Sequence, residues 1–476
     1  MTTTADSLAY QPAVQLAQAI ATRQLRSAEL VELLLERIAH DDAKLHAFVD
    51  VYADDARAAA AAADQAIDAS HAVGPLHGMP IALKDLIDIE GRVTCGGSKV
   101  WAERVSPVTA TLAGRLIAAG MIVIGKTHTV EFAMGGWGTN QHLGTPWNPW
   151  DTEEHRAPGG SSAGSGVAVA AGMAPWAIGT DTGGSVRLPS GWCGLTGLKT
   201  TIGRISMHGV LPLCPTLDTP GPMCRTAEDT AVLFNVVHGP DPADPKTLGH
   251  GIDDPMPTLE AGVAGLRLAR MPEAERDGVE SAVLDAYDTS LEVLSSLGAR
   301  IVDVRLPCPF SDMAAILGKI IGAEGYTLVG ELVENANLPL DDDVRPRILI
   351  GKSMSARDYL LALDQREQIK ASYRDALAGV DALLTPTTAT TAPTVESIDQ
   401  SGTPASFTRV ANLLDYCALA LPNGSDENGL PISFQIICGS YREALALRIG
   451  RAYQQATGWH QATPPGLIGD RSIFRD

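Results

Sequence analysis

Short apolar runs that begin or end close to glycine recur along the chain and constrain its fold more than any other feature. Examples are MIVIGK (121–126), RIVDVRLP (300–307), ALLTPTT (382–388) and PISFQII (431–437). Longer segments with helical patterns separate these runs. Their alternation predicts α/β layering with an at least partly parallel sheet.

The first third of the chain is expected to be helical. Ser27 is placed to cap a helix in which four apolar side chains share one face, and the alanine-rich stretch 57–67 extends the helical pattern. The four side chains are Leu30, Leu33, Leu34 and Ile38. No repeat of fixed period and no long low-complexity linker marks a boundary, so we expect one domain over residues 1–476.

Composition and charge exclude several classes of protein. The net charge of -20 predicts no direct binding of nucleic acid or of an anionic lipid surface. The most apolar segment, 167–178, is too short to span a bilayer and is interrupted by Gly172 and Pro175. The N-terminus lacks a secretory signal, and the seven scattered cysteines include no C-x-x-C pair. These features predict a cytoplasmic protein with reduced thiols, no metal site and no membrane partner.

Two short motifs suggest other enzymes. GMIVIGKT (120–127) matches the P-loop pattern, but its interior is strand-like, so we interpret it as a strand that forms no phosphate-binding loop. GSSAG (160–164) matches the nucleophile elbow, with Ser162 as nucleophile and a downstream histidine as its base. A polar, loop-like segment precedes it where a buried strand is required, so this interpretation is less favoured. The candidate histidines are His208, His238, His250 and His460.

Lys84 is a candidate general base. It follows the apolar run 81–83, which predicts the buried end of a strand. Burial lowers the pKa of a lysine and so favours a neutral amine that accepts a proton. The alternative is an ordinary surface lysine paired with Asp85 or Asp88.

The segment GTDTGGSVR (179–187) is a candidate for the nucleophile. Its glycines allow successive backbone amides to converge, and the amides of residues 182–185 would hold an oxyanion. Ser185 would then attack a carbonyl. The alternative is a Gly and Ser loop without chemistry.

Three blocks together resemble the amidase signature family of serine hydrolases: GMPIALKD, the Gly- and Ser-rich residues 159–187, and the closing segment 429–460. The resemblance implies α/β/α layers around a large mixed, partly parallel twisted sheet. It also implies a single amidase domain without cofactor or metal. The expected parts of that domain are a helical part at about 1–70, a catalytic core at about 75–235, a variable and mostly helical excursion at about 240–375, and a core-completing part at about 380–465.

The resemblance further implies a proton relay among three side chains. Lys84 would be the base, Ser161 the bridging serine and Ser185 the nucleophile, with a cis peptide bond between Gly160 and Ser161. The oxyanion amides would belong to Thr182, Gly183, Gly184 and Ser185. Supporting roles fall to Gly160, to Ser162, and to Asp181 with Arg187 as a buried ion pair that fixes the loop.

The substrate expected from these observations is a small-molecule amide. The family includes A subunits of tRNA-dependent amidotransferases, but their usual arginine and tyrosine appear here as Met207 and His208. This departure favours a stand-alone amidase that hydrolyses a C–N bond, with a homodimer left open. Met134 and Gly135 are expected to line the acyl pocket. The alternatives are a carbamate or ester hydrolase with the same triad, a glutamine-hydrolysing A subunit, and a non-catalytic scaffold.

Overall fold

The centre of the molecule is a twisted sheet of 11 strands, in a computed structural model that describes residues 8–467. From one edge to the other the strands are β1 (Phe48–Val51), β3 (Ile122–Thr127), β2 (Pro80–Lys84), β4 (Trp176–Asp181), β6 (Thr219–Cys224), β5 (Thr196–Lys199), β10 (Cys417–Ser425), β11 (Pro431–Cys438), β9 (Ala382–Pro386), β7 (Arg267–Arg270) and β8 (Arg300–Val302). The four runs quoted from the sequence correspond to β3, β8, β9 and β11.

The sheet is mixed. β2 runs parallel to β3 and β4, and β7 runs parallel to β8 and β9. The other pairs are antiparallel. The predicted α/β fold with a large, partly parallel sheet is therefore confirmed.

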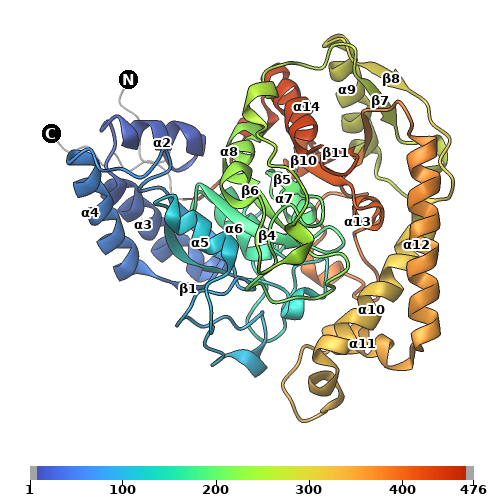
Figure 1. Ribbon diagram of the computed structural model, residues 1–476, viewed down its shortest axis with the longest axis horizontal. Helices are drawn as coiled ribbons and strands as arrows, with labels where there is room; N and C mark the ends of the chain where they lie inside the picture. The colour runs from blue at the N-terminus through green and yellow to red at the C-terminus, as the bar shows by residue number, and fades with distance from the viewer. Residues whose placement is uncertain (1–7, 468–476) are drawn as a thin grey trace.

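Helices cover both faces of the sheet and extend beyond its ends (Figure 1). They are α2 (Ala13–Ala21), α3 (Ser27–Leu45), α4 (Ala53–Asp68), α5 (Thr111–Ala118), α6 (Ala163–Ala170), α7 (Arg187–Trp192), α8 (Ala227–Val237), α9 (Ser281–Ser296), α10 (Phe310–Glu334), α11 (Val344–Leu349), α12 (Ala356–Ala376), α13 (Arg409–Leu414) and α14 (Glu443–Ala456). α6 packs against α7, whereas α14 packs against α8 and α9. In Figure 1, α2–α4 lie at one end of the molecule and α10–α12 at the other.

Helix α3 buries the predicted apolar face, but its N-terminus differs from the prediction. The buried side chains include Leu30, Leu33, Leu34 and Ile38. Ser27 is the first helical residue, and its hydroxyl donates to the Gly78 carbonyl at 2.6 Å. The carboxylate of Glu29 accepts from the Arg26 amide at 2.9 Å instead. The prediction of Ser27 as the cap is thus wrong, because its hydroxyl makes a tertiary contact.

The segment 240–375 is mostly helical and also completes the sheet, since β7 and β8 lie within it. Its α10 is long and apolar enough to cross a membrane by length and composition alone. That helix packs against α11, α12 and α13, and Met313, Leu317 and Ile320 lie on its buried side. Its apolar side chains therefore contribute to the core of the fold.

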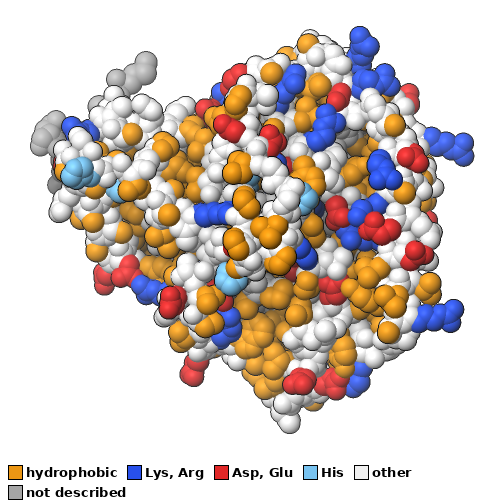
Figure 2. Space-filling model, viewed as in Figure 1, with side chains coloured by type: hydrophobic (Ala, Val, Ile, Leu, Met, Phe, Trp, Pro, Cys, Tyr) orange, Lys and Arg blue, Asp and Glu red, His pale blue; other side chains and the backbone are white. Residues whose placement is uncertain are grey.

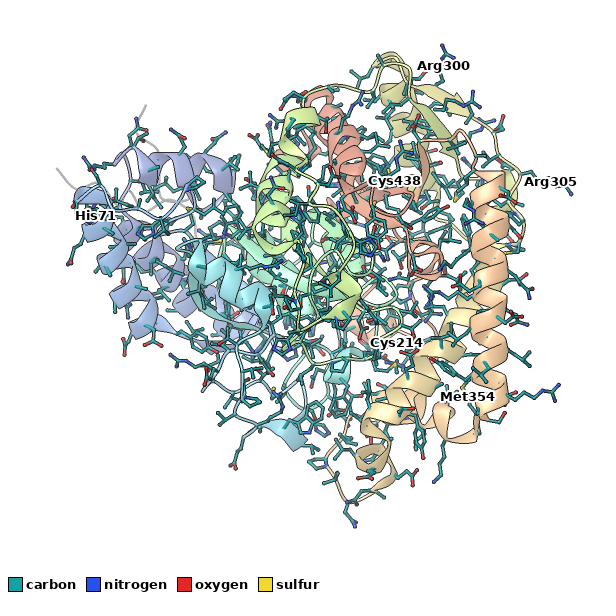
Figure 3. The ribbon with its side chains drawn as sticks, viewed as in Figure 1. His71, Cys214, Arg300, Arg305, Met354 and Cys438 are labelled. Atoms are coloured by element: carbon teal, nitrogen blue, oxygen red, sulfur yellow. The ribbon has the colours of Figure 1, made fainter. Side chains whose placement is uncertain are left out.

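Apolar and charged side chains share the surface visible in Figure 2, and the cysteine thiols are not paired. Figure 2 shows hydrophobic side chains gathered on the lower part of the visible face, with charged side chains of both signs around them. All seven cysteines are free. Cys214 and Cys438, labelled in Figure 3, lie well apart in the fold.

Candidate active site

Lys84 lies at the end of β2, between β3 and β4, and is fully buried. Its Nζ donates to the Ser161 Oγ at 2.7 Å and to the Thr180 Oγ1 at 2.8 Å. Burial lowers the pKa of this amine to about 7, although the charges of Asp218 and Asp181 act in the opposite direction. A lysine in this setting is neutral at a pH only slightly above neutrality.

The surface ion pair that was the alternative for Lys84 is not formed, because both acidic neighbours have other partners. Asp85 accepts from the Lys126 Nζ at 2.9 Å, and Asp88 accepts from Arg104 at 2.8 Å. Lys126 belongs to the sequence that matches a P-loop, and it lies on β3, fully buried. The P-loop-like motif therefore forms strand β3, and its lysine is hydrogen-bonded to the Asp85 carboxylate.

Ser161 lies in the tight loop that precedes α6. Its carbonyl accepts from the Val130 amide at 3.2 Å and from the Thr129 hydroxyl at 3.0 Å. The peptide bond between Gly160 and Ser161 is cis. A Cβ atom on Gly160 would lie 2.6 Å from the Gly138 amide nitrogen, so only glycine fits there. These contacts hold the Ser161 hydroxyl against Lys84.

Ser162 occupies the position before α6, and the backbone of Thr180 holds its hydroxyl. The Ser162 Oγ donates to the Thr180 carbonyl and accepts from the Thr180 amide, both at 3.2 Å. Within residues 8–467 the structure records no bond between this hydroxyl and a histidine. His238 and His250 have other partners, the Phe234 carbonyl and the Tyr441 hydroxyl. The elbow interpretation thus has no base.

Asp181 ends β4 and organises the loop that follows. Its carboxylate accepts from the Gly184 amide at 2.8 Å, from the Val186 amide at 3.2 Å, and from the Arg187 Nε and Nη2, both at 3.0 Å. Burial raises the pKa of this carboxyl, but the Arg187 charge and hydrogen bonds outweigh that effect and hold the pKa at about 2. Both side chains of this ion pair are fully buried.

Arg187 also reaches the last third of the chain. It donates to the Thr408 carbonyl at 2.7 Å, to the Asn412 Oδ1 at 2.7 Å and to the Gln435 Oε1 at 2.8 Å. The ion pair therefore connects the loop at residues 182–185 to α13 and β11.

The oxyanion amides expected from the sequence are not equivalent. The Gly184 amide is directed at Asp181, so in this structure it is not offered to a substrate. For the amides of Gly183 and Ser185, the described part of the chain supplies no hydrogen-bond acceptor. The Ser185 carbonyl accepts from the Ser162 amide at 3.3 Å, which brings the two serine segments together. No hydrogen bond of the Ser185 hydroxyl to a described residue is recorded.

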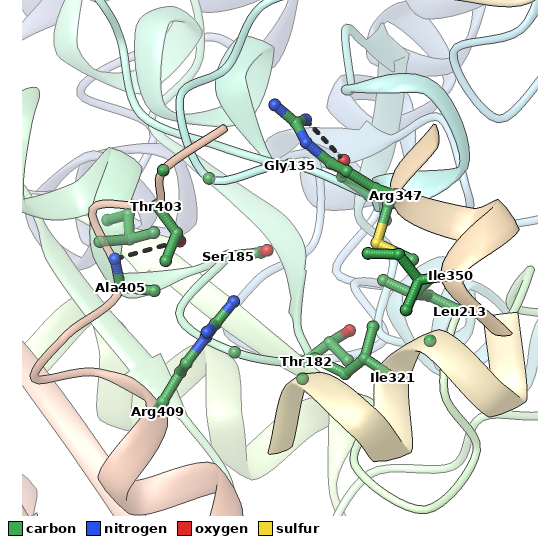
Figure 4. A pocket seen from close by; sticks show the side chains of 18 of the residues that line it. Gly135, Thr182, Ser185, Leu213, Ile321, Arg347, Ile350, Thr403, Ala405 and Arg409 are labelled. Carbon is green, nitrogen blue, oxygen red and sulfur yellow. Dashed lines mark hydrogen bonds between the residues drawn. The ribbon is translucent and has the colours of Figure 1, made fainter. Parts of the chain in front are cut away.

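Ser185 lines a cavity of about 250 Å³ (Figure 4). The cavity lies between α10 and two loop segments, residues 133–136 and residues 182–185, which we call the catalytic loops. Thr182 and Gly183 lie on its wall, as do Met134 and Gly135, the two residues proposed from the sequence for the acyl pocket. Several other lining residues were not predicted individually from the sequence, because they have no local motif and come from distant segments. They include Leu213, Ile321, Arg347, Ile350, Thr403 and Arg409. Among the described residues no group of three His, Cys, Asp or Glu side chains is placed to hold a metal ion.

Comparison with known proteins identifies relatives along nearly the whole chain. A family model described as Amidase matches residues 29–447. The A subunit of the glutamyl-tRNA(Gln) amidotransferase from Chloroflexus aurantiacus is 37% identical, with 94% of this chain and 96% of that protein covered. The protein of the same name from Pseudomonas aeruginosa is 36% identical, with 95% and 98% covered.

Solved structures agree with these sequence relatives. The native peptide amidase from Stenotrophomonas maltophilia superposes with a TM-score of 0.85 at 27% identity, over 96% of this chain and 99% of that chain. A chain described as part of a vestigial protein complex, from work on the origins of an s-triazine catabolic enzyme, gives a TM-score of 0.88 at 31% identity. That likeness covers 94% of this chain and 99% of the other.

These findings correct the prediction on partners. The motifs predicted a small amide as substrate, charge and composition predicted no nucleic acid and no membrane partner, and a homodimer was left open. The chain's relatives are instead named as subunits of a glutamyl-tRNA(Gln) amidotransferase. One structural neighbour is described as part of a protein complex. Net charge was a poor guide because it describes the whole surface and carries no information on one local interface.

Proposed function

The chain belongs to the amidase family of hydrolases, and we propose that it hydrolyses a carboxamide C–N bond through an acyl-enzyme formed at Ser185. The contact between Lys84 and Ser161 carries this proposal. Within residues 8–467 this fully buried lysine bonds to two hydroxyl groups and to no carboxylate, a setting suited to removing a proton from a serine.

The relay begins when neutral Lys84 accepts the proton of the Ser161 hydroxyl, which in turn accepts the proton of Ser185. The Ser185 oxygen then attacks the amide carbonyl, and the amides of Gly183 and Ser185 donate to the developing oxyanion. As the C–N bond breaks, the protons return along the same residues to the departing amine. Water next attacks the acyl-enzyme by the same route and releases the acid and Ser185.

The names of the relatives favour the alternative in which the chain is the amide-hydrolysing component of a larger assembly, with glutamine as the amide. Met207 and His208 stand where the amidotransferase A subunits usually have arginine and tyrosine. These two differences are no evidence against glutamine as the substrate, because neither side chain contacts the cavity. Met207 packs against the core, His208 is exposed, and neither lines the cavity. The bacterial relatives and the free thiols support a cytoplasmic location.

Ammonia release tests the proposed function. Purified protein is assayed for ammonia release with glutamine, aliphatic and aryl primary amides and a carbamate, and for acid release with an ester, with Ser185→Ala as the control. We expect ammonia from at least one amide with the unchanged chain and none with the variant. Equal release by both proteins, or hydrolysis of the ester alone, would refute amide hydrolysis at Ser185.

A sulfonyl fluoride provides a second test, because it labels an activated serine. Peptide mapping should place the label on Ser185. A label on Ser162 would instead support the elbow interpretation and contradict the relay.

A further inference from the structure

Arg409 is the first residue of α13, and its side chain lies against the catalytic loop. A Cβ atom built on Gly183 would lie 3.7 Å from the Arg409 Cγ and 3.8 Å from its Nε. Figure 4 shows the guanidinium pointing into the cavity on the side of Ser185. A positive charge therefore lies beside the loop that carries the nucleophile.

This guanidinium lacks the partners that a partly buried arginine usually has. The buried Nε has no hydrogen-bond acceptor, and Nη1 has only the Ala314 carbonyl, at 3.4 Å. No carboxylate within residues 8–467 forms an ion pair with it. Consistently, burial lowers the pKa of Arg409 with no offsetting negative charge. Such a group is costly unless an anion reaches it.

Arg347, the other arginine of the cavity, differs from Arg409 because protein acceptors occupy it. Its Nη1 donates to the Met134 carbonyl at 3.1 Å, and its Nη2 donates to the carbonyl and the Oε1 of Gln400 at 2.6 and 2.7 Å. It therefore fixes the pocket wall at Met134, while its charge adds to the positive potential. Of the two cavity arginines, Arg409 is therefore the one whose guanidinium has N–H donors without an acceptor among the described residues.

The cavity wall contains no acidic side chain to bind a cation, since none of its described lining residues is Asp or Glu. Two buried carboxylates, Asp181 and Asp218, lie next to the loop at residues 182–185. Asp181 is saturated by Arg187 and two amides, and Asp218 accepts from the Thr182 hydroxyl at 2.5 Å and from the Leu213 amide at 2.8 Å. Both are buried, and neither lines the cavity.

We infer that Arg409 binds a carboxylate on the acyl part of the substrate and that the pocket offers no carboxylate to an ammonium. This inference rests on the proposed function and specifies its substrate class: amides that carry a carboxylate, such as half-amides of dicarboxylic acids. Glutamine would bind through its carboxylate alone, and its amino group would add nothing.

Three amides of equal chain length provide the test. Pentanamide has no charge, glutaramate adds a carboxylate, and glutamine adds an ammonium to glutaramate. We expect kcat/KM for glutaramate to exceed that for pentanamide by roughly 10- to 100-fold, the range of a charge-assisted hydrogen bond. Glutamine should be no better than glutaramate. Because chain length is also a variable, succinamate is compared with butanamide in the same way.

Variants assign the preference to its residue. Arg409→Met should abolish the preference for the anion, and Arg409→Lys should restore part of it. Arg345→Met is the matched control, since Arg345 also donates to backbone carbonyls but lies outside the cavity. It should leave the preference unchanged. A preference that survives in Arg409→Met, or pentanamide as good as glutaramate, would overturn the inference.

Calorimetric binding to Ser185→Ala separates this inference from the proposed function, because it needs no turnover. Tighter binding of glutaramate than of pentanamide, lost when Arg409→Met is added, supports the anion site even if no amide is hydrolysed. Equal binding of the two overturns it even if Ser185 is active. Glutamine bound at least tenfold more tightly than glutaramate would likewise overturn it, by revealing a site for the ammonium.

Discussion

The pH dependence of turnover provides the most direct test of the proposed base. Lys84 acts as a base only when neutral, and burial lowers its pKa to about 7. At that pKa the neutral fraction is about 0.1 at pH 6, about 0.5 at pH 7 and about 0.9 at pH 8. We therefore expect kcat/KM to rise roughly tenfold between pH 6 and pH 8 and to remain high at alkaline pH.

The assay measures initial ammonia release with an amide that does not titrate in this range, after a check that activity lost at pH 6 returns at pH 8. In Asp218→Asn the midpoint should move to lower pH, because Asp218 raises the pKa of Lys84. The Asn oxygen can still accept from Thr182. Asp303→Asn removes the same charge at the exposed edge of the sheet, where Asp303 pairs with Arg270, and should not move the midpoint.

Two results would refute this reasoning. A kcat/KM that is level between pH 6 and pH 8, or highest near pH 5, would mean that Lys84 is not the group that must lose a proton. A midpoint that moves to higher pH in Asp218→Asn would contradict the electrostatic account of its pKa.

Three further substitutions test the site and its support. Lys84→Met should lower kcat roughly 100- to 10,000-fold, as measured by ammonia release, without a change in far-UV circular dichroism; full activity would exclude Lys84 as the base. Arg187→Met leaves the Asp181 carboxylate buried without its counter-charge, so urea unfolding should show a loss of about 3–5 kcal/mol, and a loss below about 1 kcal/mol would contradict the importance of the pair. Gly184→Ala should lower both stability and activity, because φ is +138° there and a Cβ would lie 2.3 Å from the Thr408 Oγ1; unchanged thermal unfolding would show that the loop adapts freely.

The strands that the sequence predicted are those with regular apolar runs, such as β3 and β11. β6 has the sequence TPGPMC, and its two prolines and one glycine conceal a strand that pairs with both β4 and β5. Proline and glycine are poor indicators of a strand, so only the tertiary pairing reveals it. The sheet order was likewise not readable, because β5 pairs with β10 although the two strands lie far apart in the sequence.

The candidate site was predictable in part because its chemistry lies in short, ordered blocks. The position of Lys84 after an apolar run predicted a buried strand end, and the structure places it there. The commitment of the Gly184 amide to Asp181 was not predictable, since it depends on how the aspartate side chain turns back over its own loop. The position of Arg409 in the cavity could not be predicted from the sequence, because no motif near Arg409 relates it to Ser185.

The ion pair of Asp181 and Arg187 links the two halves of the site. Asp181 fixes the loop that ends at Ser185, and Arg187 bonds to the Thr408 carbonyl and to Asn412, on either side of Arg409. Arg187 therefore helps to set the distance between the nucleophile and the guanidinium of Arg409, together with the bond from the Thr408 hydroxyl to the Gly183 carbonyl at 2.8 Å. It follows that a substitution at Arg187 which still folds should change substrate preference together with rate, because it removes the bonds by which one side chain holds both α13 and the loop at residues 182–185.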